Sequence, residues 1–420
     1  MANNGKIKEV TDDMKNNIIF PTIYILGNGE KFMKIKKMTI DNINGIEHLD
    51  LDFNMGLNLI CGENGVGKTT ILKAIAHQFL FGDDNFIKKH FNSEKGIVKI
   101  WSYNTECPMQ YEIDKFVPGD VNSMSSHIAE SNYLIYFSPS RTINYEKIAS
   151  LPASKNILND SVSNIHSSQL LIQGVDKNIK SWFVNRYVFA NIQNSLSIVQ
   201  KQNFELSKKV FHLLDNNLSI GTVKPDYEII LKNKDNEIYF EMLSDGYKSC
   251  IFILLGIIKE VEYRFPKINA VDFDGIIMID EIDVHLHPQW QAKLVKVLKE
   301  IFPNSQIIAT THSPSVLQNA TVEEIIPLYK DGNGDVHIKE LNLGEYGLQG
   351  WTLEEIMKDV MGMQSTKSDL YTEIIHKFDR AMDNEDQNEI LKNYEILKKM
   401  LHPENPMLQL LEMQVSEWKN

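Results

Sequence analysis

The chain has 420 residues, 43% of them apolar and 24% charged, so it is long enough to bury a sizeable core and to form more than one lobe. Its 43 basic and 56 acidic side chains give a formal net charge of −13, which excludes a basic surface over the whole chain. Three widely spaced cysteines offer neither a disulfide framework nor a zinc ribbon, which favours a reduced, cytoplasmic setting.

The first 33 residues are interpreted as an N-terminal extension, and they lack the basic and then apolar order of a signal peptide. From residue 34, alternating apolar residues predict a hairpin with its turn near Asn44-Gly45, then a third strand that enters a glycine-rich loop. Helical apolar spacing follows over 69–81. No apolar run is long enough to span a bilayer, so no membrane segment is expected.

Residues 150–225 have helical apolar spacing, and an alternation of strands and helices resumes after them. Two short apolar runs, 275–280 and 305–311, flank an amphipathic helix and predict buried parallel strands. The expected divisions are 1–33 for the extension, 34–149 and 226–345 for two halves of an α/β domain, 150–225 for a helical insertion and 346–420 for a helical C-terminal segment.

The glycine-rich loop matches the pattern G-x-x-x-x-G-K-[ST] between a predicted strand and a predicted helix. Its glycines allow successive backbone N–H groups to point at one phosphate, and the helix adds the positive end of its dipole. Lys68 would reach the β- and γ-phosphates of a nucleotide, and the Thr69 hydroxyl would hold Mg²⁺. The expected nucleotide-binding residues are Gly62, Glu63, Asn64, Gly65, Val66, Gly67, Lys68, Thr69 and Thr70.

A second motif places two carboxylates after a buried strand. The apolar run 276–279 ends at Asp280 and Glu281, which reach the carboxyl edge of the sheet, where ligands bind in open α/β sheets. Asp280 is expected to bind Mg²⁺ through water, and Glu281 to orient and deprotonate the attacking water. With the glycine-rich loop, this motif predicts an ATPase that uses ATP and Mg²⁺, with Lys68 and Glu281 as catalytic residues.

Two further segments resemble motifs of ABC ATPases, and together with the first two motifs they occur in the order found in those proteins. Leu243-Ser244-Asp245-Gly246-Tyr247 opens a helix and is similar to the ABC signature LSGGQ. The similarity implies that Ser244 and Gly246 contact the γ-phosphate of ATP held by a second protomer, although Ser244 also suits an ordinary N-cap. His312 follows a predicted strand and resembles the switch histidine of ABC ATPases, which senses the γ-phosphate, so it joins the expected catalytic residues.

The segments 33–53, 57–75 and 278–314 resemble the RecF/SMC/OLD-like branch of ABC ATPases. Within that branch the chain is most similar to the stand-alone ATPases of prokaryotic phage-defence systems, of the Septu PtuA type. The resemblance implies an α/β, ABC-type P-loop fold with a mixed or parallel sheet. It also implies a head-to-tail homodimer or higher oligomer and a partner nuclease of the HNH type, while direct contact with DNA is left open. The expected function is an ATP-gated sensor or regulator of that nuclease in antiviral defence.

The chain departs from the pattern of the branch at three places. Asn42-Ile43-Asn44 stands where many members have Asn-Phe-Arg near the adenine, so this base contact is not predicted. Asp245 puts a carboxylate in a phosphate-facing loop, where like charges repel unless the side chain points away. The glutamine that usually joins the metal is not identified, and its candidates are Gln110, Gln169 and Gln173.

Several residues near the second motif allow two interpretations. Asp283 fits either a loop that crosses a dimer interface or a helix N-cap. His285 and His287 have neither the spacing nor the additional ligands of a zinc site. Arg141 follows an apolar strand and is interpreted as a solvated loop residue rather than a phosphate ligand.

The alternative function is a RecF/SMC-like DNA-repair ATPase without a nuclease partner, which strong salt-dependent DNA affinity would favour. A self-contained OLD-type nuclease is disfavoured because no Asp-x-Asp follows Gly344. A transporter ATPase is disfavoured because the sequence shows no membrane segment.

Overall fold

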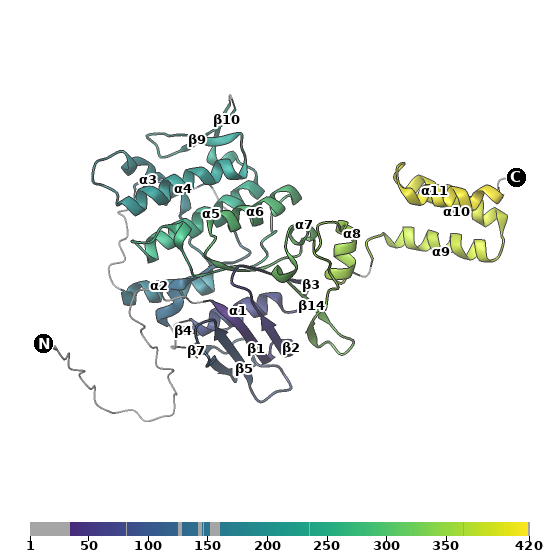
Figure 1. Ribbon diagram of the computed structural model, residues 1–420, viewed down its shortest axis with the longest axis horizontal. Helices are drawn as coiled ribbons and strands as arrows, with labels where there is room; N and C mark the ends of the chain where they lie inside the picture. Colours follow the sequence, from purple (N-terminus) through teal and green to yellow (C-terminus); the bar gives the residue numbers. More distant parts are fainter. Residues whose placement is uncertain are drawn as a thin grey trace.

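The computed structural model describes residues 34–418, apart from 81, 125–127, 142–144, 146, 152–159, 235 and 364. The predicted N-terminal extension lies outside the described residues. The described chain forms an α/β body, followed by a group of helices that stands apart from it (Figure 1).

The body is organised around a six-stranded sheet in the order β15-β14-β3-β13-β12-β8. All neighbours are parallel except β14 and β15, and the full length of β3, β8, β12 and β13 is buried, as a sheet covered on both faces requires. The strands are β3 (Leu57–Gly62), β8 (Leu134–Phe137), β12 (Ile276–Ile279), β13 (Gln306–Thr310), β14 (Ile325–Lys330) and β15 (Val336–Ile338).

A second, antiparallel sheet has the order β2-β1-β5-β6 and contains the predicted hairpin. Asn42 and Asn44 adopt positive φ values of 55° and 50°, which asparagine tolerates better than most residues. Helix α1 contacts both sheets, and its apolar side chains join their shared core. The elements are β1 (Ile35–Ile43), β2 (Ile46–Asp52), β5 (Gly96–Ser102), β6 (Met109–Ile113) and α1 (Lys68–Gln78).

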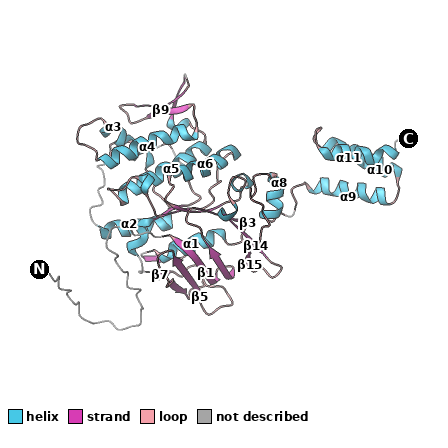
Figure 2. Ribbon diagram, in the orientation of Figure 1, coloured by secondary structure: helices cyan, strands magenta, loops and turns pink. Residues whose placement is uncertain are grey.

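A helical layer covers the other face of the six-stranded sheet and forms the second part of the core (Figure 2). The segment predicted to be helical contains α2, α3 and α4, of which α2 contacts α1 and places Leu171 in the core on the α1 side. It also contains strand β9, which the sequence pattern did not predict. The helices and strands of this part of the chain are α2 (Asp160–Gln173), α3 (Ile179–Ala190), α4 (Ile198–Leu214), β9 (Leu218–Val223), β10 (Ile229–Asn233), β11 (Asn236–Tyr239), α5 (Asp245–Arg264) and α6 (Pro288–Ile301).

Short elements join these layers. They are β4 (Gly82–Asp84), β7 (Asn122–Met124), α7 (Pro314–Leu317), α8 (Leu353–Glu355), a π turn (Ile356–Val360) and 3₁₀ turns at Ile128–Tyr133, Phe240–Met242, Ala270–Asp272, Val322–Glu324 and Ser416–Trp418. Within the described residues, none of the helices has both the length and the apolar character that a bilayer crossing requires.

The C-terminal helices α9 (Asp369–Asp383), α10 (Gln387–Met400) and α11 (Pro406–Val415) have a core of their own. The side chains that form it repeat at helical spacing. They are Ile374, Phe378, Ala381, Ile390, Tyr394, Leu397, Leu411 and Val415. We call this three-helix group the C-terminal unit.

Replacing Phe378 by alanine is expected to unfold the C-terminal unit and to leave the α/β body folded. Phe378 is 1% exposed, and a buried Phe→Ala change costs about 3–5 kcal/mol, which a small core cannot absorb. Hydrogen exchange would show lost protection over α9–α11 and unchanged protection in β3 and β12. Leu370→Ala is the control because Leu370 is 57% exposed. Equal loss of protection in the body would contradict the prediction.

Candidate active site

The glycine-rich loop connects β3 to α1, and its shape depends on a neighbouring strand. Gly62 ends β3 with φ of 137°, and a Cβ atom there would lie 2.1 Å from the carbonyl oxygen of Leu328 in β14. Only glycine therefore fits at Gly62. Gly67, with φ of 105°, is the N-cap of α1, so the open N-terminus of this helix faces the loop.

Lys68 lies over the loop and is 5% exposed. Its ammonium donates hydrogen bonds to the carbonyl oxygens of Gly62 at 2.9 Å and Glu63 at 2.8 Å. Burial lowers the pKa of Lys68, although Asp280 and other nearby groups oppose this shift. A phosphate in the loop would offer the ammonium stronger acceptors than these two carbonyl groups.

Thr69 and Asp280 are 211 residues apart in the sequence and meet at this site. The Thr69 hydroxyl donates to Asp280 Oδ1 at 3.0 Å, and the Thr310 hydroxyl donates to the same oxygen at 2.7 Å. Asp280 is 1% exposed. A hydroxyl and a carboxylate oxygen are the ligand types that Mg²⁺ prefers, so this pair fits the predicted metal site.

Glu281 follows Asp280 in a turn with an unusual backbone conformation. Its φ is 51°, a left-handed conformation that few residues with side chains adopt. Its N–H donates to the Thr310 hydroxyl at 2.6 Å, so Thr310 links Asp280 and Glu281. The structure therefore brings the predicted base beside the predicted metal ligand and Lys68, whose electrostatic environment includes both carboxylates.

Asp283 connects this turn to the segment that carries His312. One of its carboxylate oxygens accepts the Thr311 hydroxyl at 2.6 Å and the backbone N–H of His312 at 3.0 Å. The interpretation of Asp283 as a helix N-cap is wrong, because His287 caps α6 through Gln289 N–H at 3.5 Å. A role of Asp283 at a dimer interface remains a prediction.

His312 is expected to titrate below the usual range of histidine. Burial is the main cause of its lowered pKa and Lys68 adds to it, while the nearby carboxylates partly oppose both. The imidazole is therefore neutral at pH 7. NMR of ¹³C-labelled histidine should show a titration midpoint below 6.5, and Lys68→Ala should raise that midpoint by removing a neighbouring cation. A midpoint above 6.5 in the unmutated protein would refute this assignment.

Ser244 and Gly246 lie at the N-terminus of α5. The Ser244 hydroxyl accepts the Tyr247 N–H at 3.3 Å, so the N-cap interpretation is confirmed. The Asp245 side chain is 80% exposed and pairs with Lys248 at 2.8 Å. A Cβ atom on Gly246 would lie 2.9 Å from the His285 carbonyl oxygen, so α5 packs closely on the turn that follows Glu281. Contact of Ser244 and Gly246 with a second protomer's ATP remains a prediction.

Within the described residues, no hydrogen bond joins Asp280 to any of the three candidate glutamines. Gln110 is exposed on β6, and Gln169 and Gln173 are exposed on α2. The chain that leaves β8 instead brings Arg141 to the turn, where its guanidinium donates to the Glu281 carbonyl oxygen. Arg141 is 1% exposed, so its interpretation as a solvated loop residue is wrong.

On the opposite side of the loop, Asn44 holds the start of α1. Its side-chain amide donates to the Thr70 hydroxyl at 3.3 Å, and its carbonyl accepts the Lys88 N–H at 2.8 Å. Asn44 therefore connects the first hairpin to the glycine-rich loop.

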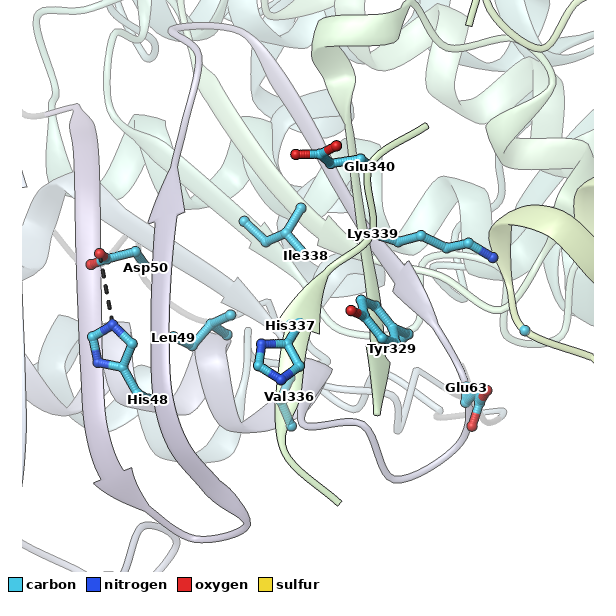
Figure 3. Close-up of a pocket in the computed structure, with 11 residues that line it drawn as sticks. His48, Leu49, Asp50, Glu63, Tyr329, Val336, His337, Ile338, Lys339 and Glu340 are labelled. Atoms are coloured by element: carbon cyan, nitrogen blue, oxygen red, sulfur yellow. Dashed lines mark ion pairs between the residues drawn. The ribbon is translucent and has the colours of Figure 1, made fainter. Parts of the chain in front are cut away.

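A surface hollow of about 740 Å³ lies next to this site rather than over it (Figure 3). Side chains of β2 and β15, including His48 and His337, face each other across it, and Glu63 is the residue of the glycine-rich loop on its wall. Lys68 and the two carboxylates after β12 do not line it. The hollow is thus separate from the assembled site.

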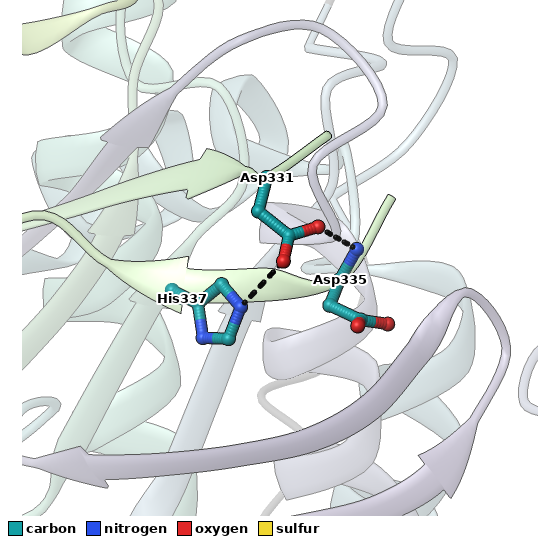
Figure 4. A group of neighbouring side chains, drawn as sticks. All are labelled: Asp331, Asp335 and His337. Atoms are coloured by element: carbon teal, nitrogen blue, oxygen red, sulfur yellow. Dashed lines mark hydrogen bonds and ion pairs between the residues drawn. The ribbon is translucent and has the colours of Figure 1, made fainter. Parts of the chain in front are cut away.

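A small group of possible metal ligands lies in the hairpin between β14 and β15 (Figure 4). It consists of Asp331, Asp335 and His337, and Asp331 accepts the Asp335 N–H at 2.9 Å. Within the described parts of the chain, His285 and His287 belong to no such group.

Comparison with known proteins shows the family of this chain. A family described as "AAA domain, putative AbiEii toxin, Type IV TA system" matches residues 57–318. The Septu protein PtuA of Bacillus thuringiensis is 42% identical over 402 residues, which cover 91% of this chain and 98% of the relative. The chain belongs to the Septu PtuA family. The α/β, ABC-type P-loop fold expected from the sequence is confirmed.

Two more distant relatives share parts of the chain. A Septu protein PtuA of Bacillus mycoides (strain KBAB4) is 26% identical over 84% of this chain, which spans 48% of that relative. The retron Ec83 probable ATPase of Escherichia coli is 26% identical over 44% of this chain and 35% of its own length. This PtuA family member thus resembles the retron probable ATPase over less than half of its own length.

Proposed function

We propose that this protein binds and hydrolyses Mg-ATP at the site formed by the glycine-rich loop, Asp280 and Glu281. One observation carries the proposal: the Thr69 hydroxyl meets the buried Asp280 carboxylate at 3.0 Å, beside the loop that holds Lys68. This arrangement joins a phosphate-binding loop to an oxygen-ligand pair for a divalent cation.

Each part of the site has a distinct role in this proposal. Lys68 and the backbone N–H groups of residues 62–70 bind the phosphates, while Thr69 and Asp280 hold the metal. Mg²⁺, when bound, would neutralise charge on the phosphate oxygens. Glu281 orients the attacking water and accepts its proton. The neutral His312 ring donates a hydrogen bond to the γ-phosphate, so the site distinguishes ATP from ADP.

The cellular role we propose is that of an ATP-gated regulator of a nuclease of the HNH type in antiviral defence. Two relatives support it: the Septu protein PtuA, aligned over almost its whole length, and the retron probable ATPase. ATP would close a head-to-tail dimer through Ser244 and Gly246, and hydrolysis would reopen it. The exposed Asp245 side chain, which pairs with Lys248, leaves the start of α5 accessible to a phosphate.

A pull-down from the native host, with Mg-ATP present, tests this role. The bait is tagged Glu281→Gln protein, which should hold ATP without hydrolysing it, and tagged Lys68→Ala protein is the matched control. A nuclease that is captured by the first bait and not by the second would support the proposal. A homodimer that carries DNA and no nuclease would instead favour the RecF/SMC-like repair ATPase.

A further inference from the structure

Arg141 stands at a defined place beside the proposed catalytic turn. It is the fourth residue after β8, and β8 pairs in parallel with β12, so that Phe137 lies opposite Ile279. The Asp280 N–H donates to the Phe137 carbonyl oxygen at 2.9 Å. The chain that leaves β8 must therefore pass the turn that contains Asp280 and Glu281.

The guanidinium of Arg141 is buried against this turn. One Nη atom donates to the Glu281 carbonyl oxygen, while the Nε and the other Nη are buried without a hydrogen-bond acceptor among the described residues. Burial lowers the pKa of Arg141 to about 10, so it stays protonated at neutral pH. A single direct hydrogen bond and the field of nearby carboxylates thus hold a buried cation in place.

Three nearby carboxylates explain why the charged guanidinium of Arg141 can be buried at this turn. Asp280, Glu281 and Asp283 all interact electrostatically with both Arg141 and Lys68. Three carboxylates close together would repel one another and an incoming triphosphate, and two cations reduce that repulsion. A glutamine at this place could donate a hydrogen bond but could not offset charge.

The hydrogen bond from Arg141 helps to hold Glu281 in an unusual backbone conformation. Glu281 has a φ of 51°, a conformation that persists only where its surroundings hold it. The Thr310 hydroxyl accepts its N–H, and its carbonyl oxygen accepts hydrogen bonds from both Arg141 and the Val284 N–H, the latter at 2.9 Å. The peptide groups on both sides of its Cα are thus anchored, and Arg141 is the side chain that anchors the second one.

We propose that Arg141 is a positioning residue of the ATPase site, which holds the main chain of Glu281 and offsets the charge of the three carboxylates. This inference rests on the proposed ATPase function. Because one direct hydrogen bond is involved, lysine should replace Arg141 better than an uncharged side chain can.

The test compares R141K, R141Q and R141M with the unmutated protein. Steady-state phosphate release gives kcat and KM, a fluorescent ATP analogue gives Kd, and hydrogen exchange reports on residues 280–286. We expect R141M and R141Q to lower kcat by about 10²-fold, the scale of a misplaced catalytic group, with ATP Kd within about threefold. Exchange over 280–286 should rise in both. R141K should recover most of the turnover and of the protection.

Three outcomes would overturn the proposal. Unchanged kcat in folded R141Q would show that Arg141 has no role in ATP turnover. A loss of ATP affinity above about tenfold, with ADP affinity retained, would make it a direct γ-phosphate ligand. If kcat of R141K were no higher than kcat of R141Q, the positive charge of Arg141 would have no role in turnover. An unmutated protein that neither binds nor hydrolyses ATP would refute the proposed function instead, and the exchange comparison would still test the Arg141 contact.

Discussion

Glu281→Gln is expected to lower ATP turnover by about 10²- to 10⁴-fold while ATP binding is retained. A positioned general base contributes a factor of this size, and the amide keeps the shape of the side chain but cannot accept the proton from water. The hydrogen bonds of the turn involve the main chain of Glu281 and should survive the change. Single-turnover hydrolysis and ATP titration would measure the two effects separately.

The matched control for this variant is Glu300→Gln. Glu300 is exposed on α6 and carries the same charge, so its replacement changes the net charge equally and should leave turnover unaltered. Near-normal turnover in Glu281→Gln would mean that the base lies elsewhere. Asp283 is a poor substitute because one of its oxygens is already held by Thr311 and His312.

Lys68→Ala is expected to abolish measurable hydrolysis and to weaken ATP binding by about 10- to 100-fold. A hydrogen bond to a charged group contributes about 1.5–3 kcal/mol, and each 1.4 kcal/mol is tenfold in affinity. The ammonium also balances the three carboxylates, so its loss exposes the phosphates to their repulsion. Isothermal titration with ATP, with magnesium present, would measure the change.

Lys73→Ala provides the comparison on the same helix. The Lys73 ammonium lies over the Phe86 ring, 5.9 Å from its centroid, and removing it should leave ATP affinity unchanged. Unimpaired ATP binding by Lys68→Ala would place the phosphates outside the glycine-rich loop. The hollow between β2 and β15 would then be the next place to examine.

The glycine-rich loop and the acidic pair could be predicted because their chemistry depends on local sequence. A strand, a glycine-rich turn and a helix form a phosphate cradle from neighbouring residues, and Gly62 even marks the close approach of β14. The buried run that ends at Asp280 predicted a strand end at the ligand-binding edge of the sheet. The first hairpin followed from apolar periodicity in the same way.

Contacts between distant segments were decided only by the tertiary structure. Arg141 looked like a loop residue, and its proposed role depends on the parallel pairing of β8 with β12, which brings it to Glu281, 140 residues later in the chain. For Asp283 the sequence allowed either a helix cap or an interface loop, and the structure shows that its carboxylate holds the segment of His312. The family to which the chain belongs and the glycine-rich loop were thus predicted from sequence alone. The balance of charge around Glu281 was not, because burial and electrostatic fields arise from chain segments that meet only on folding.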